Sequence, residues 1–284
     1  MRNNQLSKNG LLKDSDGNLF DLTQWYKDHN SEYRYGVALG NVDEATTWNK
    51  FGYNLDIDTG TEEIIASFGG AFDPTSDIIT TAQTFDIAYD GTAGGSTDGA
   101  GTTGATQLFF TYIDENFIKQ EAVHVLGTDG TDTTTFTGLG INRVVVLACG
   151  SLGYNASDIT ITATTDGTTQ AQIPAEGSVT QQGIFHSQVN HAFMADWLRF
   201  NVLKLSGGGA PKVTIKGYSW SRVTLTRYEV FRDQIDTSVE NHIELSPSQP
   251  FVIGGREVLY FTASTDANNT QVKCRFSGVE LSAL

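Results

Sequence analysis

The 284-residue sequence has little positive charge, two cysteines and no long apolar run, and each shortage excludes a class of protein. It carries 18 Lys and Arg against 33 Asp and Glu, which gives a formal net charge of -15. No stretch approaches the roughly 18 consecutive apolar residues of a transmembrane helix, and the polar residues after Met1 contain no apolar segment typical of a secretory signal. We therefore expect neither membrane insertion nor a cleaved leader.

Positive charge is missing mainly from the middle of the chain. Residues 51–198 hold two Lys or Arg against eighteen Asp and Glu, whereas residues 1–50 hold six against seven and residues 199–284 ten against eight. The net charges of the middle, first and last segments are therefore -16, -1 and +2. Two cations cannot displace the counterions of a nucleic-acid backbone, so we expect no nucleic-acid partner. The change in charge also places a domain boundary near residues 180–199.

Cysteine is rare and widely spaced. Cys149 and Cys274 are 125 positions apart, and each lies in a strand-like apolar run. This spacing matches neither a disulfide framework nor a metal-binding pair. We predict that both are buried free thiols, which is the usual state of unpaired cysteine.

Threonine and glycine, with 35 and 30 residues, are abundant, and 39% of the residues are hydrophobic. This composition supplies a core and favours strands and tight turns over helices. Short apolar or alternating segments recur about every ten residues. They are residues 77–81, 84–89, 106–113, 117–126, 133–137, 142–149, 158–163, 170–173, 182–187, 197–205, 212–215, 218–230, 242–245, 257–262 and 272–281.

We predict an all-β fold with two consecutive β-sandwich or jelly-roll-like domains, residues 71–180 and 181–284. Residues 1–70 precede them as an extended N-terminal arm or anchor with little regular structure. Within the arm, two apolar pairs around an Asp-Gly-Asn turn at residues 11–20 predict a hairpin, and residues 21–26 predict one helical turn. The aromatic residues of the arm are irregularly spaced, which is typical of side chains that pack on a neighbouring surface.

Acidic residues near the end of the arm offer two weak catalytic patterns. Residues 58–60, Asp-Thr-Gly, match the signature of aspartic proteases, but these enzymes need two such aspartates, and a single copy would require a homodimer. Asp56, Asp58, Glu62 and Glu63 form a weak acidic cluster, and some pair among the eighteen acidic residues of segment 51–198 could act as acid and base of a glycoside hydrolase, although no second feature singles one out. We interpret residues 58–60 as a turn and predict no catalytic residues and no enzyme activity.

No cofactor or metal site is predicted. Asp14, Asp16 and Asn18 resemble the start of a calcium loop, but the glycine is fourth rather than sixth and the twelfth residue is Trp25 rather than Glu. A hairpin turn is the preferred interpretation, and calcium stays open. The five histidines have no metal-binding spacing, and no phosphate-binding glycine motif occurs. His124, inside an apolar run, is interpreted as a structural histidine with satisfied hydrogen bonds.

Exposed loops and aromatic residues provide candidates for ligand contact. The glycine-rich segments 91–101 and 127–138 are expected to be surface loops. Trp197, Trp220 and Tyr228 would suit a receptor or a carbohydrate if they were exposed. Their alternation with polar residues favours packing in a core instead.

A family resemblance rests on residues 51–65, FGYNLDIDTGTEEII, followed by Gly69-Gly70 and Phe72-x-Pro74. This stretch resembles the opening of a group of tailed-phage virion structural proteins, common in phages of aquatic bacteria. Ile65 stands where that group usually has tryptophan. The similarity extends over roughly residues 11–284, through short structural motifs at residues 114–123, 140–144, 155–162, 172–175 and 181–185.

The resemblance implies a non-enzymatic structural component of a tailed-phage virion, assembled in the bacterial cytoplasm. We expect a capsid decoration or head-associated protein that forms homo-oligomers and anchors through its arm to virion proteins such as the major capsid protein. The alternative is a tail, neck or fibre-base component that binds a receptor or carbohydrate on the host surface. The charge distribution predicts that the acidic residues 71–180 face solvent and that the arm and residues 181–284 meet other chains.

Overall fold

The computed structural model describes residues 11–13, 19–21, 37, 45–91, 97–206, 209–246 and 251–282. The chain divides into two compact units, Met1–Thr47 and Trp48–Leu284. In the first unit, β1 (Leu11–Lys13) and β2 (Leu19–Asp21) form an antiparallel pair, which agrees with the predicted hairpin. The calcium candidates Asp14, Asp16 and Asn18 and the predicted helical turn after residue 21 lie outside the described residues.

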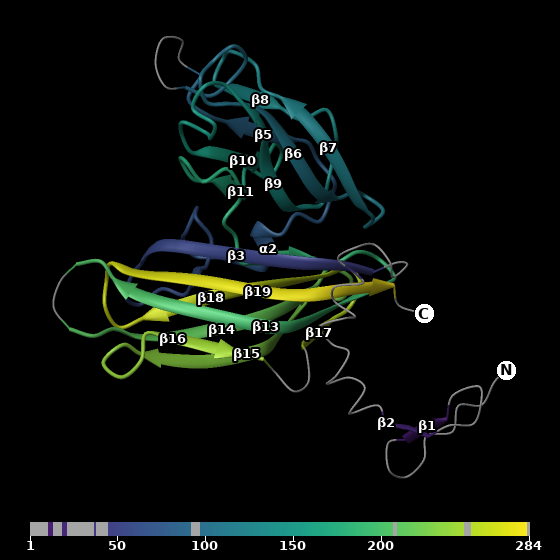
Figure 1. Ribbon diagram of the computed structural model, residues 1–284, viewed down its shortest axis with the longest axis vertical. Coiled ribbons are helices and arrows are strands. Elements are labelled where there is room, and N and C mark those ends of the chain that lie inside the picture. The colour runs from purple at the N-terminus through teal and green to yellow at the C-terminus, as the bar shows by residue number, and fades with distance from the viewer. Residues whose placement is uncertain are drawn as a thin grey trace. The chain divides into compact units, whose positions relative to one another are not determined.

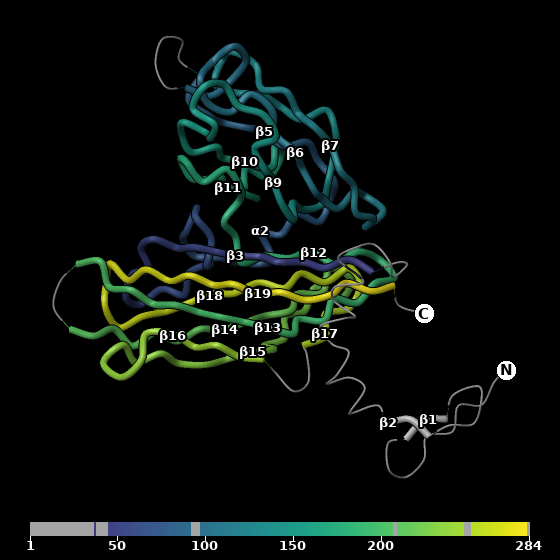
Figure 2. The backbone as a smooth tube through the Cα atoms, in the orientation of Figure 1, coloured from purple at the N-terminus to yellow at the C-terminus, as the bar shows by residue number. Residues whose placement is uncertain are grey.

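The first pair of sheets in the second unit is built from residues 85–173 (Figures 1 and 2). One sheet has the order β11 (Thr169–Ile173), β10 (Ile159–Ala163), β5 (Phe85–Ala88), β8 (Thr131–Thr133). The other has the order β7 (Lys119–Val125), β6 (Ala105–Ile113), β9 (Gly140–Cys149). Asp114 closes the β6–β7 hairpin, because its carboxylate accepts hydrogen bonds from the amides of Asn116 and Ile118, each at 2.9 Å.

The second pair of sheets contains the remaining strands of this unit (Figure 1). One sheet runs β12 (Ile184–His186), β18 (Glu257–Thr265), β14 (Lys212–Ser221), β15 (Thr226–Asp236), with β4 (Glu63–Ile64) also paired to β18. The other runs β16 (His242–Leu245), β13 (His191–Lys204), β19 (Thr270–Ser282), β3 (Ala45–Ile57), with β17 (Phe251–Ile253) also paired to β13.

Each pair of sheets encloses its own hydrophobic cluster, because alternate residues of facing strands point inward. In the first cluster, the rings of Phe110 and Phe136 lie 5.2 Å apart, edge to face. In the second, Phe200 stacks on Phe231 at 5.4 Å and lies edge to face with Phe261 at 5.3 Å. The prediction of an all-β fold is confirmed.

A third cluster covers the outer face of the β12-β18-β14-β15 sheet. The chain after β4 contributes apolar side chains to it, and the ring of Phe72 lies 4.9 Å from that of Tyr260. This segment includes the short helix α2 (Pro74–Asp77), whose start is fixed by proline in the first turn and by Asp73, which accepts a hydrogen bond from the amide of Thr75 at 2.9 Å.

The two pairs of sheets are nested in the chain rather than strictly sequential. β3 and β4 join the second pair, the chain then builds the whole first pair, and it returns to the second pair at β12. The first pair is therefore an insertion between β4 and β12. The division into an arm and two domains at residues 70 and 180 stays a prediction.

Residues 45–57 differ from the predicted arm, because they form the 13-residue strand β3. The inward positions of this strand are Trp48, Lys50, Gly52 and Asn54, all buried, while more apolar residues such as Leu55 point outward. A strand with buried polar residues lacks the alternation that predicts a core-facing strand.

Local signals explain the other differences in element bounds. The expected strand at residues 77–81 is instead the end of α2 and an irregular segment. The expected strand 218–230 is two strands, β14 and β15, joined by a turn in which Leu225 has a positive φ of 54°. The expected strand 133–137 is replaced by β8, which ends at Thr133. Within the described residues, no helix has the length and apolar character required to span a membrane.

Candidate binding groove

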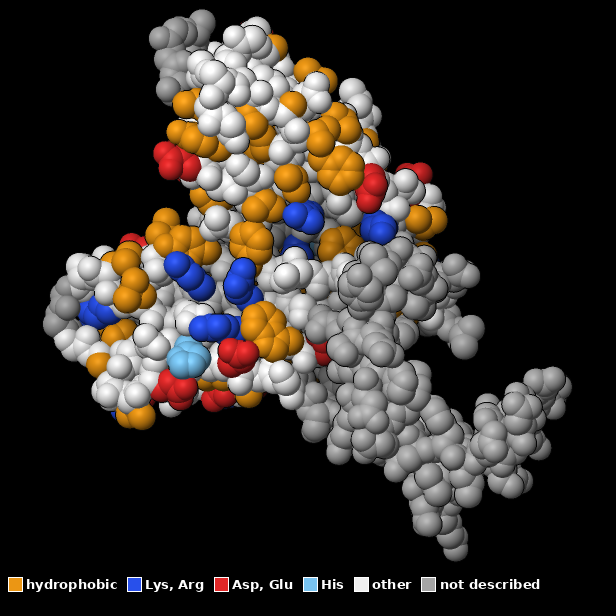
Figure 3. All heavy atoms as spheres, in the orientation of Figure 1, with side chains coloured by type: hydrophobic (Ala, Val, Ile, Leu, Met, Phe, Trp, Pro, Cys, Tyr) orange, Lys and Arg blue, Asp and Glu red, His pale blue; other side chains and the backbone are white. Residues whose placement is uncertain are grey.

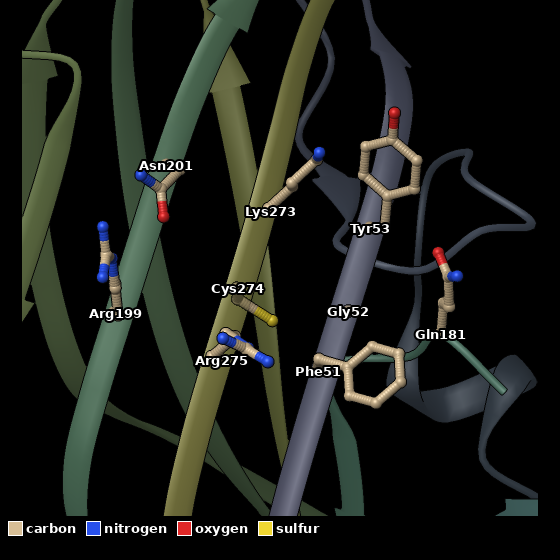
Figure 4. Close-up of a pocket in the computed structure, with 9 residues that line it drawn as sticks. All are labelled: Phe51, Gly52, Tyr53, Gln181, Arg199, Asn201, Lys273, Cys274 and Arg275. Atoms are coloured by element: carbon tan, nitrogen blue, oxygen red, sulfur yellow. The ribbon is translucent and has the colours of Figure 1, made fainter. Parts of the chain in front are cut away.

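The outer face of the β16-β13-β19-β3 sheet carries a hollow of about 500 Å³ (Figure 4). Three neighbouring strands supply most of its lining, and Gln181, in the segment before β12, lies at its edge. We refer to this hollow as the cationic groove. Its side-chain lining from the three strands is Arg199 and Asn201 of β13, Lys273 and Arg275 of β19, and Phe51 and Tyr53 of β3.

The alternation of the strands places the cations on this face. Phe200 of β13 and Cys274 of β19 point into the core, so the residues on either side of each point outward. The antiparallel register sets Arg199 directly opposite Arg275 and Asn201 opposite Lys273. Three positive side chains therefore lie on adjacent positions of one sheet face, and Figure 3 shows Lys and Arg gathered there. Like charges directly opposite each other destabilise a sheet.

Few groups of opposite charge offset this cluster. Arg199 lies 3.6 Å from the carboxylate of Glu244, and both side chains are about half exposed. The Nζ of Lys273 lies 4.8 Å from the centre of the Tyr53 ring, a cation–π contact. Among the residues that the structure describes, no carboxylate forms an ion pair with Lys273 or Arg275. The groove thus keeps a surplus of positive charge.

The β3 wall of the groove depends on close backbone approach at Gly52. A Cβ atom there would lie 2.2 Å from the Ile65 carbonyl oxygen and 2.4 Å from the Gly183 amide nitrogen. Only glycine allows β3 to pack against these two segments while its neighbours face the groove. The Tyr53 hydroxyl accepts a hydrogen bond from the Gln271 side chain, and burial raises the Tyr53 pKa.

A second set of basic side chains lies buried where the two pairs of sheets meet. Lys50 of β3 donates a hydrogen bond to the carbonyl oxygen of Asn142 in β9. The Asn142 amide pairs with the backbone of His186 in β12, at 2.8 Å as donor and 2.7 Å as acceptor. Arg222 donates to the carbonyl oxygen of Leu139 at 2.6 Å and lies 3.0 Å from Nδ1 of His186. We call Lys50, Asn142, His186 and Arg222 the basic junction.

Burial changes the protonation of this junction. It lowers the pKa of Lys50 to about 7, with a further contribution from the charge of Arg143. Burial, followed by the charges of Arg222 and Lys50, holds the pKa of His186 well below its usual value of 6.5. Burial lowers the pKa of Arg222 to about 9, which leaves the guanidinium charged at neutral pH. Arg222 is therefore the one group of these three that carries a full charge at neutral pH.

The acidic residues considered as catalytic candidates make structural contacts instead. Glu62 lies 2.5 Å from the Lys216 ammonium and accepts a hydrogen bond from Thr262 at 2.6 Å. Glu63 is buried and accepts hydrogen bonds from the side chain of Asn54 and from two backbone amides. Asp56 is exposed.

Asp58-Thr59-Gly60 forms the predicted turn. Asp58 is exposed, Gly60 has a positive φ of 82°, and Thr59 donates hydrogen bonds to Asn268. The structure therefore gives this stretch a role in shaping the backbone. The backbone amide of Asp58 also donates a hydrogen bond to the carboxylate of Glu63 at 2.9 Å.

Both cysteines are free, as predicted, but the prediction that both are buried is confirmed for one residue and wrong for the other. Cys274 is buried, and burial raises its pKa to about 12, whereas Cys149 is partly exposed near the end of β9. The prediction that His124 is satisfied is also wrong. Within the described part of the chain its Nε2 has no hydrogen-bond partner and lies 3.7 Å from the carboxylate of Asp132, which is already bonded to Tyr89.

The three aromatic candidates differ in exposure. Trp220 is buried in the cluster under the segment 64–78, as the core interpretation predicted. Trp197 is partly exposed and donates a hydrogen bond to Glu244 at 3.1 Å, and Tyr228 is 55% exposed. Of the two candidate loops, residues 92–96 lie outside the described residues, and residues 127–138 contain the short strand β8.

Comparisons with known proteins give no family. No protein-family model matches the chain, and no curated protein matches it. Among solved structures, T=1 particles derived from infectious bursal virus show 9% identity and a TM-score of 0.23 over 84% of this chain and 70% of the other. The VP2 subviral particle of infectious bursal disease virus shows 11% identity and a TM-score of 0.21 over 85% and 73%. TM-scores this low do not establish a shared fold.

Sequence reasoning missed both sets of basic residues. The net charge of residues 199–284 is close to zero, which hides a local cluster of cations. The alternation in β13 and β19 does place Arg199, Lys273 and Arg275 on outward faces, but their cross-strand register is not readable from sequence. The sequence did not indicate that Lys50 is buried, because lysine in a polar segment is usually a surface residue.

Proposed function

We propose that this chain is a non-enzymatic structural protein of a virus particle that associates with copies of itself. The resemblance to tailed-phage virion proteins and the all-β architecture support the proposal. Within that role, a capsid decoration or head-associated protein, anchored by its N-terminal segment, is the preferred position. The observation that carries self-association is an apolar outer face on the β7-β6-β9 sheet, which lies within residues 71–180 and so departs from the expectation that these residues face solvent.

This apolar face is exposed although the chain is strongly acidic. Val123 and Val125 of β7 and Leu147 of β9 are 53%, 61% and 52% exposed. Val123 is paired with Phe109 of β6, which is paired in turn with Val145 of β9, so a row of apolar side chains crosses the whole sheet. Figure 3 shows hydrophobic side chains over this sheet. Contiguous exposed apolar surface of this kind marks protein interfaces more often than solvated surface.

The position of β7 strengthens the proposal. β7 pairs with β6 on one side and is the last strand of its sheet. An edge strand with exposed valines is a site where another chain can add by backbone pairing or by apolar contact. The structure protects this edge with only one exposed charge in β7, that of Glu121.

The test is sedimentation velocity of the full chain and of the Val123→Asp/Val125→Asp double variant. We expect the wild type to associate with increasing concentration and the variant to stay monomeric, because burying two carboxylates at an interface is costly. Val239→Asp is the matched control, since Val239 is 85% exposed in a turn of the second pair of sheets. A wild type that stays monomeric, or a double variant that associates equally well, would contradict the proposal.

A second candidate function is host-surface binding by a tail, neck or fibre-base component. The observation that favours it is the β14–β15 turn and the start of β15, where Val223 and Leu225 of the turn and Tyr228 of the strand are all more than half exposed. Binding of labelled wild-type protein to host cells, lost in Tyr228→Ala/Leu225→Asp and retained in Val239→Asp, would support this function. Equal binding by both variants would count against it.

A further inference from the structure

The cationic groove has an arrangement of charge that is unfavourable in the isolated chain. Arg199 and Arg275 are directly opposed on neighbouring strands, and Lys273 lies two residues from Arg275 on the same face. Such a cross-strand pair of like charges weakens a sheet unless a counter-charge lies between them. Of the three cations, Glu244 forms an ion pair with Arg199 alone, at 3.6 Å. The Glu244 carboxylate also accepts a hydrogen bond from Trp197. This sheet face therefore carries positive charge that no carboxylate of the described residues fully balances.

The exposure and the lining of the groove indicate which kind of ligand it can bind. Lys273 and Arg275 are exposed, and neighbouring strands of one sheet carry most of the lining, as Figure 4 shows, so the cations lie on an accessible sheet face. Two guanidinium groups can each take a carboxylate through two parallel hydrogen bonds, and the ammonium of Lys273 adds a point charge. Phe51 and Tyr53 provide a partly buried aromatic wall beside these cations. The groove thus suits the edge of a protein that presents carboxylates.

We propose that the cationic groove is the docking site for the acidic pair of sheets of a second copy of this chain, with its carboxylates between Arg199, Lys273 and Arg275. This inference rests on the proposed self-association. The first pair of sheets, residues 85–173, holds ten Asp and Glu against two Lys or Arg, a net charge of -8, so every copy brings a carboxylate-rich surface at the same concentration as the groove. Exposed acidic residues of the first pair of sheets include Asp86, Glu115, Glu121, Asp158 and Asp166.

Charge complementarity gives this contact a direction. The acidic surface belongs to the first pair of sheets and the groove to the second. The first pair of sheets of one copy would therefore bind in the groove of the next copy. A contact between two different surfaces generates rings or extended arrays rather than an isolated pair unless the same two copies also exchange it. Oppositely charged surfaces also raise the rate of encounter and make it sensitive to salt.

The test compares wild type, Arg275→Glu and Lys212→Glu by sedimentation velocity at about 0.05 M and about 0.5 M salt. Lys212 is an exposed cation on the other sheet of the same pair and serves as the control. We expect Arg275→Glu to weaken association about tenfold or more at low salt, and Lys212→Glu and wild type to behave alike. Arg275→Gln removes the like-charge pair without adding a charge, and it should weaken association while the thermal unfolding temperature does not fall.

The remaining outcomes separate this inference from the proposed function. If Val123→Asp/Val125→Asp abolishes association and Arg275→Glu and Arg275→Gln leave it unchanged, the groove is not the docking site, although self-association stands. If the groove instead binds oligogalacturonate in a manner that Arg275→Glu abolishes, while association is unaffected, the ligand is an acidic sugar and the inference is overturned. A wild type that is monomeric at both salt concentrations overturns both proposals.

Discussion

Two sets of basic side chains in this protein differ in burial and in charge. In the basic junction, Lys50 and His186 are buried and their pKa values are lowered, Lys50 donates a hydrogen bond to a backbone carbonyl oxygen, and Nδ1 of His186 lies 3.0 Å from Arg222. In the cationic groove, Lys273 and Arg275 are exposed and have no carboxylate partner among the described residues. In the junction, burial reduces the charge of Lys50 and His186 and leaves Arg222 charged, whereas the groove keeps the charge of its exposed cations and needs an external counter-charge.

The two sets of basic residues can contribute to function in different ways. The buried Lys50 amine can donate a hydrogen bond to the Asn142 carbonyl oxygen with or without its extra proton, and this bond ties β3 to β9 across the two pairs of sheets. An exposed guanidinium cannot reduce its charge in this way, because its pKa is far above neutral. The same residue types therefore serve internal cohesion in one place and recognition in the other.

Of the substitutions that test this contrast, replacing Lys50 should change the free energy of unfolding the most. The folded chain releases the Lys50 proton near pH 7 and the unfolded chain near pH 10.5, so the unfolded chain binds more protons between these values. The free energy of unfolding therefore rises with pH across this window. Burying the charged form of Lys50 lowers that free energy by about 5 kcal/mol, and this loss is fully present below pH 7. Lys50→Met should flatten the rise in the free energy of unfolding between about pH 7 and about pH 10.

Urea unfolding of wild type, Lys50→Met and Lys212→Met over this pH range checks the expectation. Lys212 is exposed and paired with Asp236, so its replacement should leave the pH dependence of the wild type intact. Parallel curves for all three proteins would show that Lys50 keeps an ordinary pKa in the folded chain, and the contrast between junction and groove would then be lost.

Gly52 connects the two regions, because it lies on β3 between Lys50 of the junction and Tyr53 of the groove. Gly52→Ala should cost about 3 kcal/mol, since its Cβ would collide with the backbone of Ile65 and Gly183. Gly254→Ala is the control, because a Cβ there lies 3.5 Å from the nearest atom, in the Glu257 side chain, and should cost within about 0.5 kcal/mol. Equal melting temperatures for both variants would contradict the packing described for β3.

These packing contacts mark the limit of prediction from sequence. The strand series and the hairpin at Asp114 were predictable, because apolar alternation and turn residues are local signals. The insertion of the first pair of sheets between β4 and β12 was not, because β3 pairs with β19 more than two hundred residues later. The groove could not be predicted for the same reason, since its cations come together only through the pairing of β13 with β19.

His186 should make the junction sensitive to acid, with a smaller effect than Lys50. Its pKa is held well below 6.5, so as the pH falls below 6.5 the unfolded chain takes up a proton that the folded chain does not. Stability should fall in this range, and His186→Leu should make the fall between about pH 7 and about pH 5 shallower. His242→Gln, at an exposed histidine beside Glu240, should retain the full fall in thermal unfolding experiments.

The smallest expected effect is on the groove in the isolated chain. Arg275→Gln removes a directly opposed like charge and should raise the free energy of unfolding by about 0.5 kcal/mol. Measured in monomeric protein at low salt, the gain should disappear at high salt, because the charges are exposed. A loss of stability on this substitution would mean that Arg275 already has a favourable partner, and the groove would then carry no surplus charge.

Hydrogen exchange by mass spectrometry, with the protein compared as monomer and at concentrations where it associates, would locate the surfaces that meet in the associated state. We expect slower exchange on association in β7, at the edge of the apolar face, and in β13 and β19, which carry the groove. The β14–β15 turn should exchange equally in both states. Unchanged exchange in β7 and β19, with protection confined to the β14–β15 turn, would contradict the account and favour a different surface.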